Sequence, residues 1–290
     1  MKVALIADTH LAERAAAFVG NWQAIRLWLE TTTPDLIIHL GDITADGLHD
    51  PSEFQTAAAA LRDVFQPLRV LPGNHDIGDV PAAGGPLVTD DRLAAYHAAF
   101  GADHWSCELG CWQLIGLNAQ LLGHGGEAEA QQLAWFEAAL ASHDGPLGLM
   151  LHKPLLPAPD DSAAPRERYV PGPARDALLT LLGRRDCRFV VSGHTHQTHR
   201  FRRDGIDHVW VPPASFIIPD HLQEPVGRKL VGLMTLHLDE VGPCGKAGEP
   251  EEPGYRFDVV TPASVVCHDI TDHLQIYSRS MDRVGGGEVS

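Results

Sequence analysis

Five short apolar runs of this 290-residue chain each end in Asp, Asn or His, and this pattern restricts the fold more than any other feature. The runs are residues 3–7, 36–40, 68–71, 147–151 and 189–192. Runs of four to eight aliphatic residues are typical of buried strands. Longer stretches with helical spacing of apolar residues separate them. This alternation predicts an α/β fold, in which helices cover a largely parallel sheet.

The remaining elements follow from the same patterns. We expect helices at 13–32, 53–65, 91–100, 129–142 and 174–184. We expect a hairpin of strands 104–109 and 112–117 that turns at Gly110, a second of strands 198–203 and 208–211 around Asp204-Gly205, and strands at 230–238 and 255–260. The Pro-rich stretch 153–173 is long enough to be a functional loop, and 241–253 is expected to be a surface loop. Without internal repeats, residues 1–284 are interpreted as a single domain, with the motifs within 1–215, a β-rich part at 216–270 and a disordered tail at 285–290.

Charge and composition exclude several classes of protein. The formal net charge is −16, and 44% of the residues are hydrophobic. This composition indicates a globular chain, and its charge argues against partners such as nucleic-acid polymers or anionic membranes. No signal peptide or apolar run of membrane-spanning length is recognisable, and five Cys without a Cys-x-x-Cys pair indicate reduced thiols. We therefore expect a cytoplasmic protein, and the sequence leaves open whether it forms a homo-oligomer.

The residues at the ends of the five runs form a set with metal-binding chemistry. They are Asp8-Thr9-His10, Gly41-Asp42, Gly73-Asn74-His75-Asp76, His152, and Gly193-His194-Thr195-His196. Loops that follow the carboxyl ends of parallel strands meet at one edge of a sheet. Imidazole and carboxylate groups suit Zn, Fe or Mn, and one carboxylate can bridge two such ions. The set therefore predicts a site for a pair of divalent transition metals, and the ligand types do not choose among Mn, Fe and Zn.

Each of these residues alone has an ordinary structural explanation. Asp8 or Asp42 could cap the helix that follows, and Asn74 could be a turn residue. A single His is more often a hydrogen-bonded surface or core residue than a ligand. Five elements in fixed order at successive strand ends are hard to obtain by chance, so the combination favours a functional site.

In this order the motifs resemble the calcineurin-like metallophosphoesterase superfamily, over roughly residues 1–215. Within it the chain is most similar to the class III cyclic-nucleotide phosphodiesterase and glycerophosphodiesterase group, to which Asp8-x-His10 and Gln132-Leu133-x-Trp135-Phe136 also correspond. The resemblance implies a four-layer α/β/β/α sandwich of two mixed sheets flanked by helices.

The resemblance also implies the site residues. Asp8, His10 and His196 would hold the first metal, and Asp42 would bridge both. Asn74, His152 and His194 would hold the second. His75 would be the catalytic residue that faces the phosphate and donates a proton or stabilises charge, with Asn74 also contacting substrate. In addition, Arg166 and Arg168 in the Pro-rich loop are candidates for binding a substrate phosphate or ribose.

Two features separate the chain from other branches of the superfamily. Ser/Thr phosphatases place an Asp three residues after the bridging Asp, where it orients the catalytic His. Here that position is Ala45, with Asp46 next, so no such His–Asp pair is expected. Purple acid phosphatases have a Tyr ligand after the bridging Asp and lack the first-motif His, and neither feature matches.

The function that these inferences favour is hydrolysis of small phosphodiesters, of cyclic-nucleotide or glycerophosphodiester type, by metal-activated hydroxide. A phosphomonoesterase or nucleotide pyrophosphatase would use the same site. A DNA nuclease is disfavoured by the acidic charge. A non-catalytic scaffold is disfavoured because all seven ligand positions and His75 are present. Substrate choice would depend on loops 77–91, 118–130 and 153–173.

Overall fold

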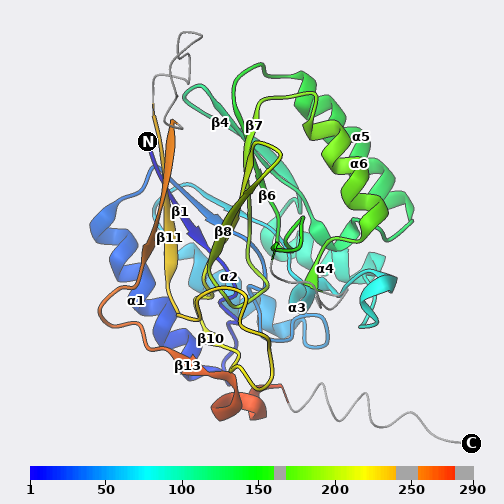
Figure 1. Ribbon diagram of the computed structural model, residues 1–290. Helices are drawn as coiled ribbons and strands as arrows, with labels where there is room; N and C mark the ends of the chain where they lie inside the picture. The colour runs from blue at the N-terminus through cyan, green and yellow to red at the C-terminus, as the bar shows by residue number, and fades with distance from the viewer. Residues whose placement is uncertain (160–167, 240–253, 278–290) are drawn as a thin grey trace, which may run out of the picture.

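Two β-sheets packed face to face form the centre of the molecule, and helices cover the outer side of each (Figure 1). The structure is a computed structural model, and it describes residues 1–159, 168–239 and 254–277. The expected four-layer α/β/β/α sandwich of two mixed sheets is therefore confirmed. The interpretation of residues 1–284 as one domain stays a prediction.

The first sheet contains the first three strands of the chain and two later ones, in the order β12-β11-β1-β2-β3. Its strands are β1 (Lys2–Ile6), β2 (Leu36–His39), β3 (Leu68–Val70), β11 (Leu233–Leu238) and β12 (Tyr255–Val260). The three N-terminal strands are parallel, whereas β11 is antiparallel to β1 and β12 is antiparallel to β11. Three parallel strands therefore end at the same edge.

The second sheet has the order β4-β5-β6-β7-β9-β8. Its strands are β4 (Trp105–Leu109), β5 (Trp112–Gly116), β6 (Leu147–Met150), β7 (Cys187–Ser192), β8 (His199–Arg203) and β9 (Ile206–Trp210). Strands β5, β6, β7 and β9 are parallel, and the two expected hairpins, β4–β5 and β8–β9, are its antiparallel margins.

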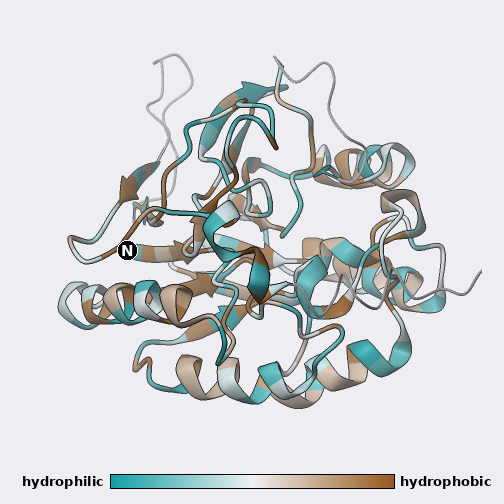
Figure 2. Cartoon of the chain, turned by 90° about the horizontal axis from the view of Figure 1, so that it is seen from below, coloured by the Kyte–Doolittle hydropathy of each residue, from teal (hydrophilic) through white to brown (hydrophobic). Residues whose placement is uncertain are grey.

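Burial on both faces explains why the strand sequences are almost continuously apolar. In β1, Val3 and Leu5 pack between the sheets, while Ala4 and Ile6 pack under the helices. Successive side chains of a strand point to opposite faces, so both sets must be apolar when both faces are covered. Figure 2 shows the same arrangement, with largely hydrophobic strands through the middle and helices of mixed hydropathy outside.

The helices divide between the two outer layers. They are α1 (Ala16–Thr32), α2 (Ser52–Arg62), α3 (Asn74–Ile77), α4 (Asp90–Phe100), α5 (Glu127–Ala141) and α6 (Gly172–Leu182). Helices α1, α2 and α4 pack on the first sheet, and α5 and α6 cover the second. None of the helices in the described ranges is long and apolar enough to cross a membrane.

Most expected elements are present, with shifted ends. The helix expected at 53–65 ends already at Arg62, and the one expected at 13–32 begins only at Ala16. Asp8 and His10 both have positive φ, and the amide of Ala15 bonds the carbonyl of Ala12 in a turn, so the helix starts after that turn. The strand expected at 230–238 starts at Leu233. The surface loop expected at 241–253 and the tail at 285–290 lie outside the described residues.

A small C-terminal unit was not expected from the sequence. Strands β10 (Phe216–Ile217) and β13 (His268–Asp269) pair in parallel, and the 3₁₀ helix η4 (Ile270–Ile276) follows directly. Two-residue strands carry no periodicity, and their pairing joins segments about fifty residues apart in sequence, so no local signal marks them. Figure 1 shows this unit below the sheets, near the chain's last described residues. Short 3₁₀ helices also occur at Pro81–Ala83 and Ala119–Leu121.

Candidate metal centre

Both sheets contribute to one group of polar side chains beyond the ends of their parallel strands. The loops after β1 and β2 supply Asp8, His10 and Asp42, and the start of α3, which follows β3, supplies Asn74 and His75. The segments after β6 and β7 supply His152, His194 and His196. Three triads among the described residues have potential ligand atoms within 4.8 Å of one another, and two of them are Asp8 with His10 and His196, and Asp42 with His152 and His194. These two triads correspond to the two ligand sets that the sequence predicts.

Asp42 belongs to the second triad and also faces His10 of the first. Its Oδ2 is 3.8 Å from His10 Nε2 on one side and 3.4 Å from His152 Nε2 on the other. Asn74 lies beside the second triad, with its Oδ1 3.2 Å from His152 Nε2. The structure thus brings all seven predicted ligand positions together, and the bridging role of Asp42 stays a prediction.

The histidines are held by their Nδ1 atoms. Nδ1 of His152 is 2.9 Å from the carbonyl of Leu40, and Nδ1 of His196 is 2.7 Å from the carbonyl of Phe216. A carbonyl can only accept, so Nδ1 carries a proton in both rings and Nε2 is the nitrogen that faces the site. Such an anchor on the second nitrogen is usual for histidines that bind metals.

His10 has a different anchor and an orphaned nitrogen. Its Nδ1 is 3.0 Å from the hydroxyl of Tyr277, which follows η4. Its Nε2 is fully buried and has no hydrogen-bond partner among the described residues. Buried polar atoms are nearly always paired. An ion held by His10 and Asp8 would supply the missing partner, so the residues fit a cation here.

The backbone at the site is in an uncommon conformation. Asp8, His10, Asp42, His194 and His196 have φ values of 54°, 47°, 51°, 67° and 52°. Positive φ is unfavourable for residues with a Cβ and tends to occur at functional sites, where the surrounding structure enforces it. Here the left-handed residues turn the chain sharply just after β1, β2 and β7.

Glycine is required next to Asp42. A Cβ built on Gly73 would lie 2.1 Å from Asp42 Oδ1 and 2.3 Å from the Asp42 amide nitrogen. These contacts are with backbone and carboxylate atoms that cannot move without displacing the site. The amide of His75 donates to the same Asp42 Oδ1 at 2.9 Å. The loop after β3 therefore fits closely against the carboxylate, and this explains the Gly73-Asn74-His75 sequence.

Burial strongly perturbs the two carboxylates. It raises the pKa of Asp8 to about 8, against the attraction of His152 and with a further rise from the negative charge of Asp42. Burial also acts to raise the pKa of Asp42, but His152 and His75 outweigh it and hold that pKa well below its usual range. Two buried carboxylates that repel each other form a site in which a cation is strongly stabilised.

The pKa values of the candidate histidine ligands are also shifted in opposite directions. Burial, assisted by neighbouring imidazoles, holds the pKa of His10 and of His194 well below the usual range and lowers that of His196 to about 4. These three are therefore neutral at pH 7, as metal ligands must be. For His152, burial is outweighed by Asp42, and its pKa rises to about 9.

His75 lines the cavity above the candidate ligands, and a backbone carbonyl contacts its Nδ1. Its Nδ1 is 2.8 Å from the carbonyl of Ala45, the residue that replaces the Asp of the Ser/Thr phosphatases. Asp46 accepts instead from Nδ1 of His49 at 2.7 Å. A backbone carbonyl thus takes the orienting position that a carboxylate would occupy. His75 also lies within 4.8 Å of His10 and Asp42, so its non-ligand role stays a prediction.

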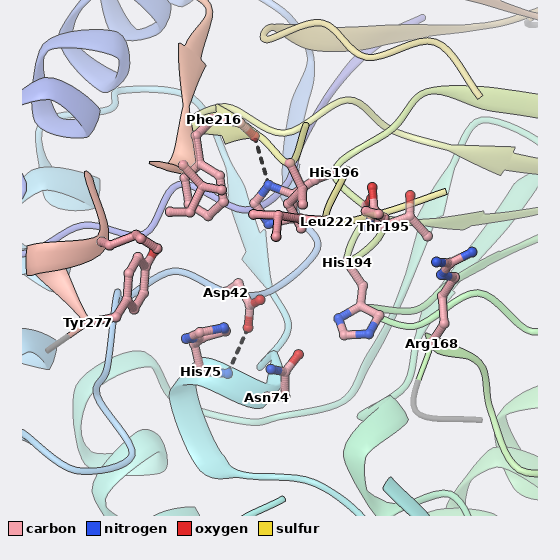
Figure 3. A pocket seen from close by; sticks show the side chains of 14 residues that line it. Asp42, Asn74, His75, Arg168, His194, Thr195, His196, Phe216, Leu222 and Tyr277 are labelled. Atoms are coloured by element: carbon pink, nitrogen blue, oxygen red, sulfur yellow. Dashed lines mark hydrogen bonds between the residues drawn. The ribbon is translucent and has the colours of Figure 1, made fainter. Parts of the chain in front are cut away.

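A cavity of about 450 Å³ opens over the centre (Figure 3). Asp42, Asn74, His75, His194 and His196 line its polar side. Of the two arginines proposed from the Pro-rich loop, Arg168 is buried and lines the cavity at the end opposite Tyr277, whereas Arg166 lies outside the described residues.

Two residues that support the site were not singled out from the sequence. Asp76, fully buried, accepts from the amides of Gly73 at 2.8 Å, Thr44 at 2.9 Å and Ile43 at 3.1 Å, and so ties the loops after β2 and β3 together. Its place directly after His75 is a signal that could have identified it. Tyr277 comes from 267 residues beyond His10, and no sequence pattern connects them.

The chain belongs to the calcineurin-like phosphoesterase family, whose model matches residues 1–198. It is 26% identical over 181 residues to a probable cyclic nucleotide phosphodiesterase of Psychrobacter arcticus, covering 59% of this chain and 60% of that protein. It is 25% identical over 221 residues to a probable cyclic nucleotide phosphodiesterase of Synechococcus, covering 68% of this chain and 74% of that one. The family implies a phosphoester hydrolase with divalent metal ions as cofactors.

Solved structures agree on the fold. A purple acid phosphatase from yellow lupin seeds aligns with a TM-score of 0.61 at 18% identity, over 81% of this chain and 49% of that one. A dimetal phosphatase from Danio rerio aligns with a TM-score of 0.56 at 17% identity, over 81% and 92% of the two chains. At such identities the likeness concerns the fold alone.

Proposed function

We propose that this chain is a dinuclear-metal phosphodiesterase that cleaves small phosphodiesters of the cyclic-nucleotide or glycerophosphodiester type. The observation that carries the proposal is that Asp42, a member of one ligand triad, also faces His10 of the other, at the bottom of a cavity of about 450 Å³. Such a cavity has the size of a small-molecule site. The names of the Psychrobacter and Synechococcus relatives support a phosphodiester as substrate.

In this proposal Asp8, His10 and His196 hold one ion, Asn74, His152 and His194 hold the other, and Asp42 holds both. When bound, divalent cations neutralise phosphate charge and lower the pKa of a coordinated water molecule toward neutrality. The chain's own contribution is to fix the ligands before substrate arrives. The anchored Nδ1 atoms and the close fit of Gly73 against Asp42 provide that rigidity.

His75 is the proposed proton donor. Because Nδ1 donates to the Ala45 carbonyl, Nε2 is the nitrogen left to face a bound phosphate. A cationic imidazole there would stabilise developing charge or protonate the leaving alkoxide. Arg168, at the other end of the cavity, adds a permanent positive charge toward the phosphate. Asn74 would contact the substrate from the floor, next to His152.

The test is hydrolysis of bis-p-nitrophenyl phosphate by the metal-free protein before and after addition of Mn²⁺. We expect no turnover without metal, turnover with Mn²⁺, and loss of turnover when a chelator is added. p-Nitrophenyl phosphate, assayed in parallel, measures monoesterase activity. A clear preference for the monoester would contradict the phosphodiesterase assignment. Absence of turnover on both esters with metal bound would contradict the proposal that the chain is a phosphoester hydrolase.

A further inference from the structure

We propose that the substrate of this centre carries an apolar ester group, which packs against an apolar wall at one end of the cavity. This inference rests on the proposed phosphodiesterase function and narrows its substrate class, because it disfavours a diester that places a glycerol group at this end of the cavity. The wall consists of Phe216, Ile218, Leu222, Ile270, Leu274 and Tyr277, and we call it the apolar wall. An alkyl or aryl ester group fits it, whereas a polyol such as glycerol does not.

The cavity has two chemically different sides. Its floor is made of the candidate ligands together with Asn74 and His75, and Arg168 lies at the end away from Tyr277 (Figure 3). The apolar wall closes the other end and comes from two segments, 216–222 and 270–277, that the pairing of β10 with β13 holds together. A phosphate at the floor would therefore direct one of its ester groups at this wall.

The inner part of the apolar wall is fixed relative to the floor. Phe216 is buried and stacks on the His196 ring, with centroids 4.2 Å apart and planes 28° apart. Its carbonyl also holds Nδ1 of His196. One residue thus anchors a candidate ligand and presents an apolar surface beside it, so the distance from phosphate to wall is set by the fold.

The outer part of the apolar wall is exposed. Leu222 and Leu274 are 57% and 45% accessible to solvent, although both line the same cavity. Single exposed leucines are ordinary, but two that converge on the mouth of a polar site form a surface that an apolar ligand would remove from water. The gain is available only to a substrate with an apolar group in this place.

Polar side chains at this end of the cavity already have partners within the protein. The Gln223 side-chain oxygen accepts from Gln197 Nε2 at 2.8 Å, and its nitrogen donates to the Thr195 carbonyl at 2.9 Å. The Tyr277 hydroxyl is bonded to His10. Burying glycerol hydroxyls here without partners would cost free energy, because a buried polar group needs a hydrogen bond. The wall therefore selects against polyol esters.

The experiment uses the Mn²⁺-loaded full chain and a series of alkyl p-nitrophenyl phosphates, from methyl to butyl, which share one leaving group. Full burial of a methylene contributes about fourfold to binding and half burial about twofold. We expect kcat/KM to rise roughly ten- to sixtyfold from the methyl to the butyl ester. The 2,3-dihydroxypropyl ester, matched to propyl in carbon number, is expected to be hydrolysed roughly tenfold or more slowly than the propyl ester.

Two variants test whether the dependence of kcat/KM on ester chain length arises at the apolar wall. In the Leu222→Gln, Leu274→Gln double variant, we expect the ratio of kcat/KM for the butyl ester to kcat/KM for the methyl ester to fall most of the way to one. Leu27→Gln is the matched control, because Leu27 is similarly exposed, at 54%, but lies on α1 away from the cavity. Its ratio should equal that of the wild type.

The outcomes separate the two proposals. Hydrolysis of every ester with no dependence on chain length, or a rise that the double variant retains, would overturn the apolar wall and leave the phosphodiesterase intact. If no ester in the series is hydrolysed with Mn²⁺ bound, the proposed function itself is wrong, and the inference fails with it.

Discussion

The orientation of each histidine at this centre depends on the atom that its Nδ1 contacts. The Nδ1 atoms of His152, His196 and His75 face backbone carbonyls, whereas that of His10 faces a side-chain hydroxyl. Carbonyls of the fold cannot be removed by substitution, but the Tyr277 hydroxyl can. His10 is therefore the candidate ligand whose anchor is open to experiment.

We predict that Tyr277→Phe weakens Mn²⁺ binding about 10- to 100-fold, the usual effect of losing a partner behind a metal-binding His. The reason is that His10 Nδ1 loses its 3.0 Å contact while the ring packing is retained. Equilibrium dialysis measures the affinity directly. Tyr255→Phe is the control, because its hydroxyl bonds Arg188 and Asp207 instead. Equal affinity of both variants and the wild type would contradict the positioning role of Tyr277.

A second prediction separates the roles of Asp42 and His75. Asp42→Ala should lose bound metal and all turnover, because both triads depend on that carboxylate. His75→Ala should keep its metal while kcat falls about 10²- to 10⁴-fold, the typical contribution of a general acid. Metal content by elemental analysis, together with bis-p-nitrophenyl phosphate kinetics, tests this. Equal loss of metal in the two variants would make His75 a ligand.

A third prediction concerns pH and stability away from the centre. His208 in β9 stacks on Phe201, and its buried Nε2 has no partner among the described residues. Burial lowers its pKa to about 4. The unfolded chain binds this proton near pH 6.5, so the free energy of unfolding is highest above that pH and falls as pH drops from about 6.5 to 4.

The variant His208→Gln does not titrate there. Between pH 7.5 and 5, the wild type should therefore lose about 2 kcal/mol more unfolding free energy than the variant. Urea unfolding of the metal-free proteins at the two pH values measures the difference. Parallel losses in both proteins would show that His208 does not contribute to the acid lability.

At the scale of elements, the site is built from the turns that follow strands. The strands themselves need only apolar residues on both faces, but the turns after β1, β2 and β7 contain residues with positive φ, and the segment after β3 contains Gly73 in close contact with Asp42. These requirements are local and stringent. They explain why substitutions of two glycines in the same chain should have opposite effects.

We predict that Gly73→Ala abolishes metal binding, because its Cβ would lie 2.1 Å from the Asp42 carboxylate. Gly20→Ala is the matched change. Gly20 lies in the interior of α1 with no atom within 4 Å of the added Cβ, so alanine should stabilise the protein by about 0.5–1 kcal/mol. Denaturant unfolding and Mn²⁺ binding measure both effects. Full metal binding by Gly73→Ala would contradict the fit described for this loop.

The same scale shows what the sequence can and cannot predict. Long apolar or amphipathic segments such as β1, α5 and the β4–β5 hairpin could be predicted because their signals are local. Helix starts were less predictable, since the positive φ of His10 and the turn before Ala16 depend on the site. Strands β10 and β13 could not be predicted, because each has two residues and is stabilised only by the other.

At the scale of the whole molecule, the centre lies where strand ends of the two packed sheets come together. Three strands of the first and two of the second deliver its residues, so the site forms only when the sheets are packed. The candidate ligands could be predicted because each follows a recognisable strand and together they match a known family pattern. Tyr277 and the apolar wall could not, because they come from the C-terminal unit, whose position is set by tertiary contacts alone.

The most direct measurement is a crystal structure of the Mn²⁺-loaded protein with anomalous scattering data. We predict two peaks about 3.5–4 Å apart on either side of the Asp42 carboxylate. One should contact Asp8, His10 and His196, and the other Asn74, His152 and His194. A single peak, or manganese bound elsewhere with these side chains free, would contradict a dinuclear centre.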